Sequence, residues 1–511
     1  MPAPVLPGTG RLLVGIDKGT SVTKTAVFDE TGRQVVSASR RIQQIHDLPG
    51  WHEEDPEETW ARTAATIRDC MTVLGPRAAD VAAVGVVGHM GGAWFVDGEG
   101  RSVRNAIAWP DTRANAVVHR LENGPDHEEY LRLTETAALP GMTVMLLAHL
   151  RHSEPELLGG TSLVLNAKDF IQLRLTGRAV SEPSDAAFVP VDIDTLAHSD
   201  RVLEILDALP WSGKFPDLVR SGEVMGEVTG AAAEHTGLPV GTPVVAGLGD
   251  APAAMVGCGA LVPGSAVSIL GTSWLSANVV SDPHGGTRGI GWMYPMPNGM
   301  FAHFVANQSG ASTLDWWLER LAPELVEARD FSVLDREVLA RPEARTALTF
   351  LPYLSAAGLQ APFKDPALRG TLLGVEDAST RGDVFRAVYE GMAYAMYDCY
   401  SAFGGPPKTL RLTGGGAASA IWPGVLSNVM GVPVELLAAD EGAALGVAAL
   451  AGTTVGLWPS LDDAVDTVVQ VTRRLEPDPE LHGAHQDQFA RFKDAQTLAC
   501  SFYNAHRGEH S

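Results

Sequence analysis

The chain has 511 residues, of which 45% are hydrophobic and 19% charged, and its 38 basic and 61 acidic side chains give a net charge of −23. This length predicts two large domains or a few smaller ones, at roughly 100–200 residues per domain, with ample apolar residues for their cores. The negative charge repels the phosphates of nucleic acids and of anionic lipids, so we expect neither as a partner, although backbone amides and a metal ion can still hold a small phosphorylated ligand.

The cysteine pattern and the N-terminal residues favour a cytoplasmic protein. The four cysteines are scattered and form no C-x-x-C pair, so we expect reduced thiols rather than a zinc site. The N-terminus lacks a basic region followed by an apolar run, which predicts no signal peptide. No run of about 18 apolar residues is present, so no membrane span is expected.

The first half of the chain alternates between strand and helix patterns. Residues 11–17 form a short apolar run that ends at a glycine-containing turn, which predicts a buried strand. Residues 24–42 predict a hairpin that follows this strand. Residues 55–74 have helical spacing, with Asp55 as the expected N-cap. Similar alternation continues to about residue 240.

A second α/β unit is predicted after a junction at residues 236–250. The order then recurs as a strand that ends at Asp250, a helix of small residues and two adjoining strands. Later segments predict a long amphipathic helix, a strand–turn–helix–strand unit and a small-residue helix, at residues 381–403, 408–437 and 441–452. We therefore expect two domains, residues 1–245 and residues 246–511.

Each unit contains a strand that runs into a Gly-Thr-Ser turn, VGIDKGTS at 14–21 and VSILGTS at 267–273. Glycine lets the backbone turn and approach a ligand, and hydroxyls and amides of such a turn can donate to phosphate oxygens. Asp17 could hold Mg²⁺ through water, and Lys18 could reach a phosphate or face solvent. Either turn alone is equally well an ordinary hairpin turn, but two in matched positions favour a polyphosphate held from both sides of a cleft.

Asp250 follows a strand and precedes the small-residue helix. This position suits an N-cap and a general base for a substrate hydroxyl about equally. The glycines of LTGGGAASA, residues 412–420, match neither the dinucleotide fingerprint nor the P-loop. They could pass close to a base or ribose, or form an ordinary tight turn.

Two further segments, GHMGGAW at 88–94 and AIAWPDTRA at 106–114, combine polar and aromatic residues near strand ends. They could line a pocket for a hydroxylated ligand through His89, Trp109, Asp111 and Arg113. The alternative is a surface turn beside a core tryptophan. A lone histidine is more often structural than catalytic, and only the glycine-rich setting of His89 makes the two interpretations about even.

From about residue 12 to residue 452, these motifs in this order resemble the FGGY carbohydrate kinases, the family of xylulose, ribulose, erythritol and glycerol kinases. The matching segments include VGIDKGTSVTKTAVFD, GHMGGAWFVDGEGRSVRNAIAWPDTRA, KDFIQLRLTGRAVSEPSDAA, GTPVVAGLGDAPAAMVGCGALVPGSAVSILGTS, GLQAPFKDPALRGTLLG, LTGGGAASAIWPGVLSNVMGVPV and EGAALGVAALAG. The resemblance implies an α/β, actin-like fold in which two RNase H-like domains flank a cleft that closes on ATP and a sugar.

The resemblance also implies roles for individual residues. Asp250 would be the catalytic base, and Asp17 and Asp250 would contribute to a Mg²⁺ site. The nucleotide would meet the two turns and the glycines near the adenosine, namely Gly19, Thr20, Ser21, Gly271, Thr272, Gly310, Gly415 and Gly416. The substrate would meet His89, Met90, Trp109, Asp250 and Trp274.

The chain departs from the family pattern in the segment that reads the sugar. Xylulose kinases carry G-Q-M-H-G where this chain has G-H-M-G-G at 88–92, so the family histidine is replaced by Gly91. W-N-D-x-R becomes W-P-D-T-R at 109–113. The resemblance implies an ATP-dependent kinase that phosphorylates a terminal hydroxyl, first of a pentulose such as xylulose, and alternatively of erythritol or another short polyol.

Two alternative functions do not involve phosphorylation of a sugar. The protein could be an actin-like nucleotide switch or a regulator that binds a sugar. A homodimer is an expectation from relatives only, because the sequence carries no interface signal.

Overall fold

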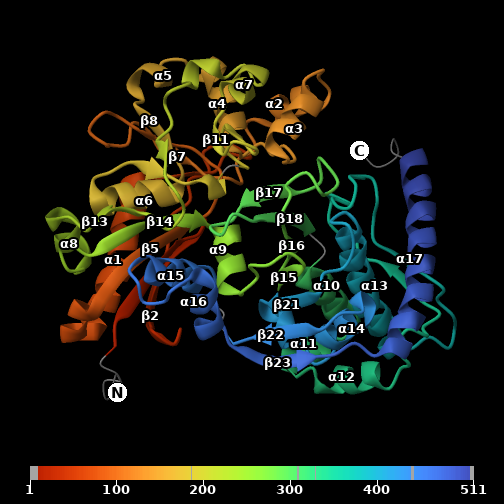
Figure 1. Ribbon diagram of the computed structural model, residues 1–511. Coiled ribbons are helices and arrows are strands. Elements are labelled where there is room, and N and C mark those ends of the chain that lie inside the picture. The colour runs from red at the N-terminus through yellow and green to blue at the C-terminus, as the bar shows by residue number, and fades with distance from the viewer. Residues whose placement is uncertain (1–9, 186, 308–309, 329, 439–441, 507–511) are drawn as a thin grey trace.

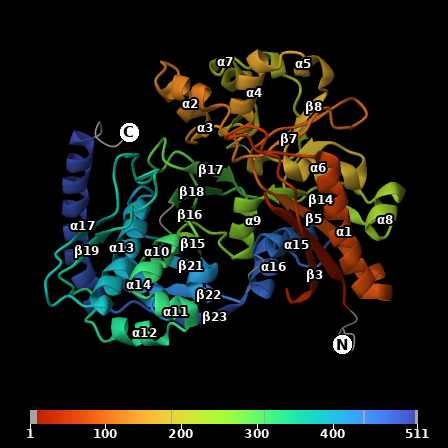
Figure 2. The same cartoon turned by 180° about the vertical axis from the view of Figure 1, so that it is seen from behind.

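The computed structural model describes residues 10–185, 187–307, 310–328, 330–438 and 442–506. Two lobes lie side by side, each built around one large β-sheet (Figures 1 and 2). We call residues 10–249 the N-lobe, and residues 265–438 with 471–506 the C-lobe. Helices α9, α15 and α16 lie between the two lobes in both views.

The N-lobe sheet has six strands in the order β13-β14-β5-β1-β2-β3. Strands β1 to β3 form an antiparallel meander, β5 and β14 run parallel to β1, and β13 is an antiparallel edge strand. In this order the strands span Val224–Glu227, Pro243–Gly249, Val81–Gly88, Leu12–Lys18, Val22–Asp29 and Gln34–Arg41. The apolar run expected to be a buried strand is β1.

The C-lobe sheet repeats this arrangement and adds one strand, in the order β17-β18-β16-β15-β21-β22-β23. Strands β15, β16 and β18 form the meander, β21 and β22 run parallel to β15, and β23 is antiparallel. In sheet order they span Trp292–Pro295, Phe301–Asn307, Trp274–Val280, Ser265–Leu270, Thr409–Thr413, Val434–Leu437 and Val471–Leu475. β1 and β15 therefore hold equivalent places, as the repeated turn predicts.

The N-lobe helices cover the sheet and form a cap above it (Figure 1). Helix α1 begins after Asp55, whose side chain accepts from the amides of Glu57 and Glu58, which confirms the predicted N-cap. The N-lobe helices are α1 Pro56–Leu74, α2 Asn115–Glu122, α3 His127–Thr134, α4 Thr143–Ser153, α5 Leu157–Gly160, α6 Ala167–Thr176, α7 Asp200–Ile205 and α8 Gly230–Thr236. Its short strands are β4 Glu53–Glu54, β6 Trp94–Val96, β7 Ala106–Ile107, β8 Leu163–Leu165, β9 Val180–Ser181, β10 Val191–Asp192, β11 Ala197–His198 and β12 Asp217–Leu218.

The C-lobe helices pack around α13, most of whose residues are buried. Helix α17 runs along the outer edge of the lobe in both views (Figures 1 and 2). The helices are α10 Ala311–Leu321, α11 Pro323–Ala328, α12 Ser332–Leu339, α13 Arg381–Ser401, α14 Trp422–Met430 and α17 Pro479–Ala505, and the short strands are β19 Thr349–Leu351 and β20 Thr371–Leu373. In the described part of the chain, no helix combines the length and apolar character needed to cross a membrane.

Helices α9 (Asp250–Gly257), α15 (Gly442–Thr454) and α16 (Leu461–Val468) join the lobes. Glycines allow α15 to approach its neighbours closely. A Cβ atom on Gly15 of β1 would lie 2.2 Å from the carbonyl oxygen of Ala444, and one on Gly446 would lie 2.1 Å from that of Ala253. Backbone therefore packs directly on backbone where α15 meets β1 and α9.

Strand β14 belongs to the N-lobe, although the sequence predicts it to be in the second unit. The sequence predicts that the strand before Asp250 opens the second unit, whereas β14 pairs with β5 and belongs to the N-lobe sheet. Hydrogen bonds to a strand far upstream decide this placement, and local sequence does not reveal them. The predicted division after residue 245 falls inside β14, and we keep it as a proposed approximate boundary.

Candidate active site

Asp17 and Asp250 lie at the same edge of the N-lobe sheet, at the ends of two strands that flank β5. Val87 of β5 pairs with Asp17 on one side and with Leu248 on the other. Asp250 is the first residue of α9, and its Oδ1 accepts from the amide of Ala251 at 2.8 Å. Gly249 holds the N-cap position, so the structural alternative for Asp250 is wrong.

The pKa values of both carboxyl groups are raised, and the charge of Asp17 contributes to the shift of Asp250. Burial, together with the charge of Asp17, raises the pKa of Asp250 to about 7. Burial raises the pKa of Asp17 to about 6, although Lys18 and Lys24 oppose this shift. A carboxylate with a pKa near neutrality is well matched to accept a proton from a hydroxyl group.

The same pair meets the requirements of a magnesium ion. Mg²⁺ in nucleotide sites is usually held by one or two carboxylates together with substrate phosphates and water. The described residues contain no cluster of three or more His, Cys, Asp or Glu side chains placed to hold a metal ion. Asp17 and Asp250 would therefore hold the ion only together with phosphate oxygens.

The first Gly-Thr-Ser turn, residues 19–21, connects β1 to β2 at the same edge. Gly19 and Thr20 are half-buried and Ser21 is exposed. The indole Nε1 of Trp109 donates to the hydroxyl of Thr20 at 2.8 Å, and the Gln44 amide donates to the carbonyl oxygen of Thr20 at 2.9 Å. The turn is thus fixed by two distant segments, and the predicted substrate segment meets the predicted phosphate turn at Trp109.

Lys18 points away from this edge, into the lobe. Its ammonium group forms a fully buried ion pair with Glu54 at 3.0 Å and also donates to the carbonyl oxygen of Gly19. The Lys18 side chain therefore neither faces solvent nor extends toward the turn's outer surface. Burial acts to raise the pKa of Glu54, whereas Lys18 and His89 act to lower it. The two neighbours prevail, and the pKa of Glu54 is lowered to about 2. The sequence analysis missed Glu54, which lies in a two-residue strand 36 residues from Lys18.

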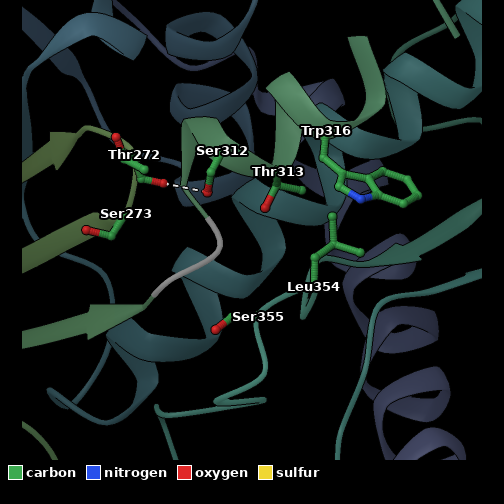
Figure 3. Close-up of a pocket in the computed structure, with 7 residues that line it drawn as sticks. All are labelled: Thr272, Ser273, Ser312, Thr313, Trp316, Leu354 and Ser355. Atoms are coloured by element: carbon green, nitrogen blue, oxygen red, sulfur yellow. Dashed lines mark hydrogen bonds between the residues drawn. The ribbon is translucent and has the colours of Figure 1, made fainter. Parts of the chain in front are cut away.

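The second Gly-Thr-Ser turn, residues 271–273, opens onto a cavity of about 420 Å³. Its lining residues come from the turn, from α10 and from the loop after β19, and are Thr272, Ser273, Ser312, Thr313, Trp316, Leu354 and Ser355 (Figure 3). Figure 3 shows the Ser312 hydroxyl bonded to the carbonyl oxygen of Thr272, at 2.7 Å. The α10 and Leu354–Ser355 walls were not predicted from the sequence.

The predicted nucleotide glycines of the C-lobe gather beside this turn. Gly310 packs on it, because a Cβ there would lie 2.4 Å from the carbonyl carbon of Ser273. Gly415 and Gly416 follow β21, the parallel neighbour of β15. Gly416 contacts the end of β15, whereas a Cβ on Gly415 would meet nothing within 4 Å. Three glycines therefore lie with Gly271 and Thr272 at one edge of the C-lobe sheet, namely Gly310, Gly415 and Gly416.

The predicted substrate residues other than Trp274 separate into three groups. Met90 lies against the backbone of Gly249, because a Cβ there would be 2.3 Å from its sulfur, and this places Met90 beside Asp250. His89 instead turns toward Glu54, with Nε2 3.5 Å from Oε1, and burial lowers the pKa of His89. Trp109 is 43% exposed above the first turn.

Trp274 is not a pocket residue. Its side chain is fully buried and packs in the apolar core of the C-lobe with Leu270 and Val305. The pleat of β16 turns it inward, whereas the sequence places it only one residue from the turn. We therefore remove Trp274 from the predicted substrate contacts.

Gly91 adopts a left-handed conformation with φ of 74°. A Cβ there would lie 2.9 Å from both the carbonyl oxygen of Gly141 and Cδ1 of Phe188. The aromatic ring of Phe188 therefore occupies the space that a side chain at this position would need. Phe188 stacks on Tyr294 of β17, with ring centroids 6.1 Å apart and an interplanar angle of 7°.

Comparison with known proteins identifies matches over nearly the whole chain. Models of the N-terminal and C-terminal domains of the FGGY family of carbohydrate kinases match residues 12–257 and 266–455. Erythritol kinase of Brucella abortus is 30% identical over 500 residues, with 95% of this chain and 96% of the relative covered. Xylulose kinase of Escherichia coli is 30% identical over 493 residues, with 94% and 98% covered.

Solved structures agree with the fold described above. The crystal structure of xylulose kinase from Rhodospirillum rubrum has a TM-score of 0.88 at 25% identity and covers 97% of this chain and 100% of that one. Gluconate kinase from Lactobacillus acidophilus also has a TM-score of 0.88, at 21% identity, with 98% and 100% covered. The expected α/β architecture with two actin-like domains is therefore confirmed.

Proposed function

Because the chain belongs to the FGGY family of carbohydrate kinases, we propose that it transfers the γ-phosphate of ATP to a terminal hydroxyl of a small sugar or polyol, with Asp250 as general base. The observation that carries the role of Asp250 is its position at the start of α9, where burial and Asp17 raise its pKa to about 7. A base with this pKa is ready to take the hydroxyl proton near neutral pH.

The reaction is an in-line displacement at phosphorus. The substrate hydroxyl oxygen forms a bond to the γ-phosphorus as the bond from that phosphorus to the β,γ-bridging oxygen breaks. The hydroxyl proton passes to Asp250, and ADP leaves with the bridging oxygen. Phosphoryl transfer of this kind depends mainly on positioning and charge neutralisation, so the two Gly-Thr-Ser turns serve as the positioning elements.

We place the nucleotide along the edge of the C-lobe sheet. Gly271 and Thr272 would donate backbone amides and a hydroxyl to phosphate oxygens, as would Gly19, Thr20 and Ser21 from the N-lobe. The cavity beyond Thr272 is lined by Trp316 and Leu354 on its apolar side (Figure 3), which suits the nucleoside part of ATP. Gly310, Gly415 and Gly416 would allow close approach of the ligand at the same edge.

Asp17 and Asp250 would hold Mg²⁺ together with the phosphate oxygens. The ion, when bound, neutralises charge on the phosphates and withdraws electrons from the transferred group. Asp17 keeps its carboxylate beside the site through the β1 pairing with β5.

The substrate is a short sugar or polyol, and its identity is the finer part of the proposal. A pentulose such as xylulose remains the first candidate, and erythritol or another short polyol the second. Relatives with both names are 30% identical to this chain. Phe188 fills the space beside Gly91, and we expect the loss of this space to favour short substrates.

The experiment is a measurement of ADP formation from Mg-ATP with pentuloses, pentitols, tetritols, glycerol and hexuloses, with the phosphorylated product identified by mass spectrometry. One compound should raise ADP formation far above the sugar-free rate and appear as its monophosphate. If ATP binds and no compound is phosphorylated, the kinase proposal fails and an actin-like nucleotide switch becomes the better account. Light scattering on the same sample tests the expected homodimer.

A further inference from the structure

A fully buried charged cluster lies beside β14, the strand that precedes Asp250. The ammonium group of Lys168 on α6 contacts three carboxylates, at 2.8 Å for Asp169, 3.3 Å for Glu182 and a short distance for Asp185. Each of these side chains is at most 1% exposed. One cation therefore faces three acidic groups, and the cluster needs further hydrogen-bond donors.

Two of the three carboxylates have such donors. Asp169 accepts from the backbone amide of Asn166 at 3.1 Å, in the capping box of α6. Glu182 accepts from the amide of Ser184 at 2.9 Å and from the hydroxyl of Ser221 at 2.5 Å. These hydrogen bonds account for Asp169 and Glu182 as structural residues of the N-lobe.

Asp185 differs from Asp169 and Glu182 in its hydrogen-bond partners. Lys168 contacts its Oδ2 as an ion pair, but neither Oδ2 nor Oδ1 has a hydrogen-bond partner among the residues that the structure describes, and Oδ1 has no cation beside it either. Burial, with Asp169 and Glu182, raises the pKa of Asp185 to about 7 despite Lys168. A buried polar atom without a partner is rare in native proteins and commonly marks a place for a ligand group or a water molecule.

The position of Asp185 points to a ligand group. Its Oδ1 would lie 3.4 Å from a Cβ atom on Gly249, the residue before Asp250, on the side where Met90 lies. The hydroxyl of neighbouring Ser184 accepts from the amide of Gly249 at 2.8 Å. Asp185 is thus tied to the same short stretch of backbone that positions the base.

The C-lobe covers this place with an aromatic residue. Strand β17 packs on the turn at Pro183–Asp185, and burial, together with the charges of Asp250 and Asp185, raises the pKa of Tyr294. Tyr294 stacks on Phe188, which itself lies beside Gly91. Asp250, Met90, Asp185 and the two rings therefore lie close to one another where β17 meets the N-lobe.

We propose that Asp185 is a specificity-determining residue that hydrogen-bonds a second hydroxyl of the sugar or polyol, away from the hydroxyl that is phosphorylated. Lys168 fixes Oδ2, so that Oδ1 faces the substrate. A polyhydroxyl chain would then be held at both ends, by Asp250 at the reacting hydroxyl and by Asp185 at the distant one. This inference rests on the proposed kinase function and names the group that reads the substrate.

The test compares Asp185→Asn and Asp185→Ala with the matched control Asp169→Asn, which removes a charge from the same cluster on the side of the α6 cap. The substrate is the compound that the wild-type protein phosphorylates best, together with its monodeoxy analogues. We expect Asp185→Ala to raise the KM of that compound at least tenfold and leave the KM of ATP within twofold. Asp185→Asn, which keeps the shape of the side chain, should raise the KM of the sugar less. Asp169→Asn should leave the KM of the sugar within twofold of the wild-type value.

The deoxy analogues separate a contact with substrate from a structural role. In the wild-type protein one analogue should lose at least tenfold in kcat/KM relative to the parent, and this loss should largely disappear in both Asp185 variants. The inference is overturned if every deoxy analogue keeps its full loss in the variants, or if Asp169→Asn changes the sugar KM as much as Asp185→Asn. In either case phosphorylation by the wild-type protein still supports the kinase function, whereas a wild type that phosphorylates nothing overturns both.

Discussion

Asp17 and Asp250 extend from strands on opposite sides of β5, and the negative charge of Asp17 contributes to the raised pKa of Asp250. The carboxylate of Asp17 therefore helps to raise the pKa of Asp250 into a range that suits proton transfer. Placing two acidic groups near one another in a site with little water is an established way to raise the pKa of one of them. Asp17 and Asp250 would hold Mg²⁺ together with phosphate oxygens, and the positive charge of the ion would oppose this effect.

This relationship predicts the pH dependence of the reaction. Asp250 must be deprotonated to accept a proton, so kcat/KM for the sugar should fall as the pH is lowered, with a midpoint at or below about 7 because Mg²⁺ held with ATP would oppose the raised pKa. Asp17→Asn removes the neighbouring charge and should move the acid limb of the profile to lower pH, in addition to lowering activity. The measurement is kcat/KM between pH 5 and 9 for both proteins. An acid limb that stays at the same pH in Asp17→Asn would show that Asp17 does not act on the base.

Lys18 should act on stability rather than on phosphate binding. Lys18→Met leaves Glu54 buried without its cation, and breaking such a pair costs about 3–5 kcal/mol, so the melting temperature should fall clearly. The double variant Lys18→Met with Glu54→Gln removes both charges and should recover much of the loss. Calorimetry on the two single variants and the double variant completes the cycle. A stable Lys18→Met protein with a raised KM for ATP would instead assign Lys18 to the phosphates.

The close packing of α15 on α9 predicts an effect of one added methyl group. In Gly446→Ala the new Cβ would lie 2.1 Å from the Ala253 carbonyl oxygen and 2.7 Å from the Gly257 amide nitrogen. Because both neighbours are backbone atoms, the helices must move apart, at a cost of about 1–3 kcal/mol or more. Gly230→Ala on α8 is the control, since its Cβ would meet nothing within 4 Å. Equal melting temperatures for the two variants would contradict the packing described.

A histidine bridges the lobes and should make their contact depend on pH. His284 of the C-lobe contacts Glu135 and Asp194 of the N-lobe, both at 2.7 Å, and these carboxylates raise the pKa of His284 above 6.5. A raised pKa in the folded state means that the stabilisation is fully present below about pH 6.5 and is lost as the pH rises through the folded value. Arg288 also donates to Glu135, at 2.9 Å.

The measurement is the melting temperature of the wild type and of His284→Gln between pH 5.5 and 8.5. The difference between them should be largest at the acid end and shrink toward the alkaline end. His152→Gln, which removes a histidine that contacts Asp207 within the N-lobe, serves as the control. A difference that grows with pH would contradict the bridging role.

The parts of the site that the sequence predicts are those with a local signal. A strand that ends in Asp17 and a Gly-Thr-Ser turn, its repeat before Thr272, and an aspartate that follows a strand and opens a helix can each be read within a few residues. The Asp55 cap is equally local. The period-2 pattern of β1 also places Lys18 on the same face as the buried Ile16, a signal that the sequence analysis did not use.

The parts that the sequence did not predict depend on distant partners. Glu54 meets Lys18 only through tertiary packing, and β14 belongs to the first sheet only because it pairs with β5. Trp274 lies next to a functional turn, but the pleat of β16 turns it into the core. Asp185 lies inside a segment that matches the family motifs, and its unsatisfied oxygen becomes visible only in three dimensions.

The measurement that tests the central claim most directly is ADP formation by Asp250→Asn with Mg-ATP and the best substrate, alongside calorimetric titration of both ligands. The account predicts that sugar-stimulated turnover falls about 10²–10⁴-fold, as expected for the loss of a general base, while both ligands still bind and the melting temperature does not fall. Turnover within tenfold of the wild type, with binding intact, would contradict the assignment of Asp250 as the base.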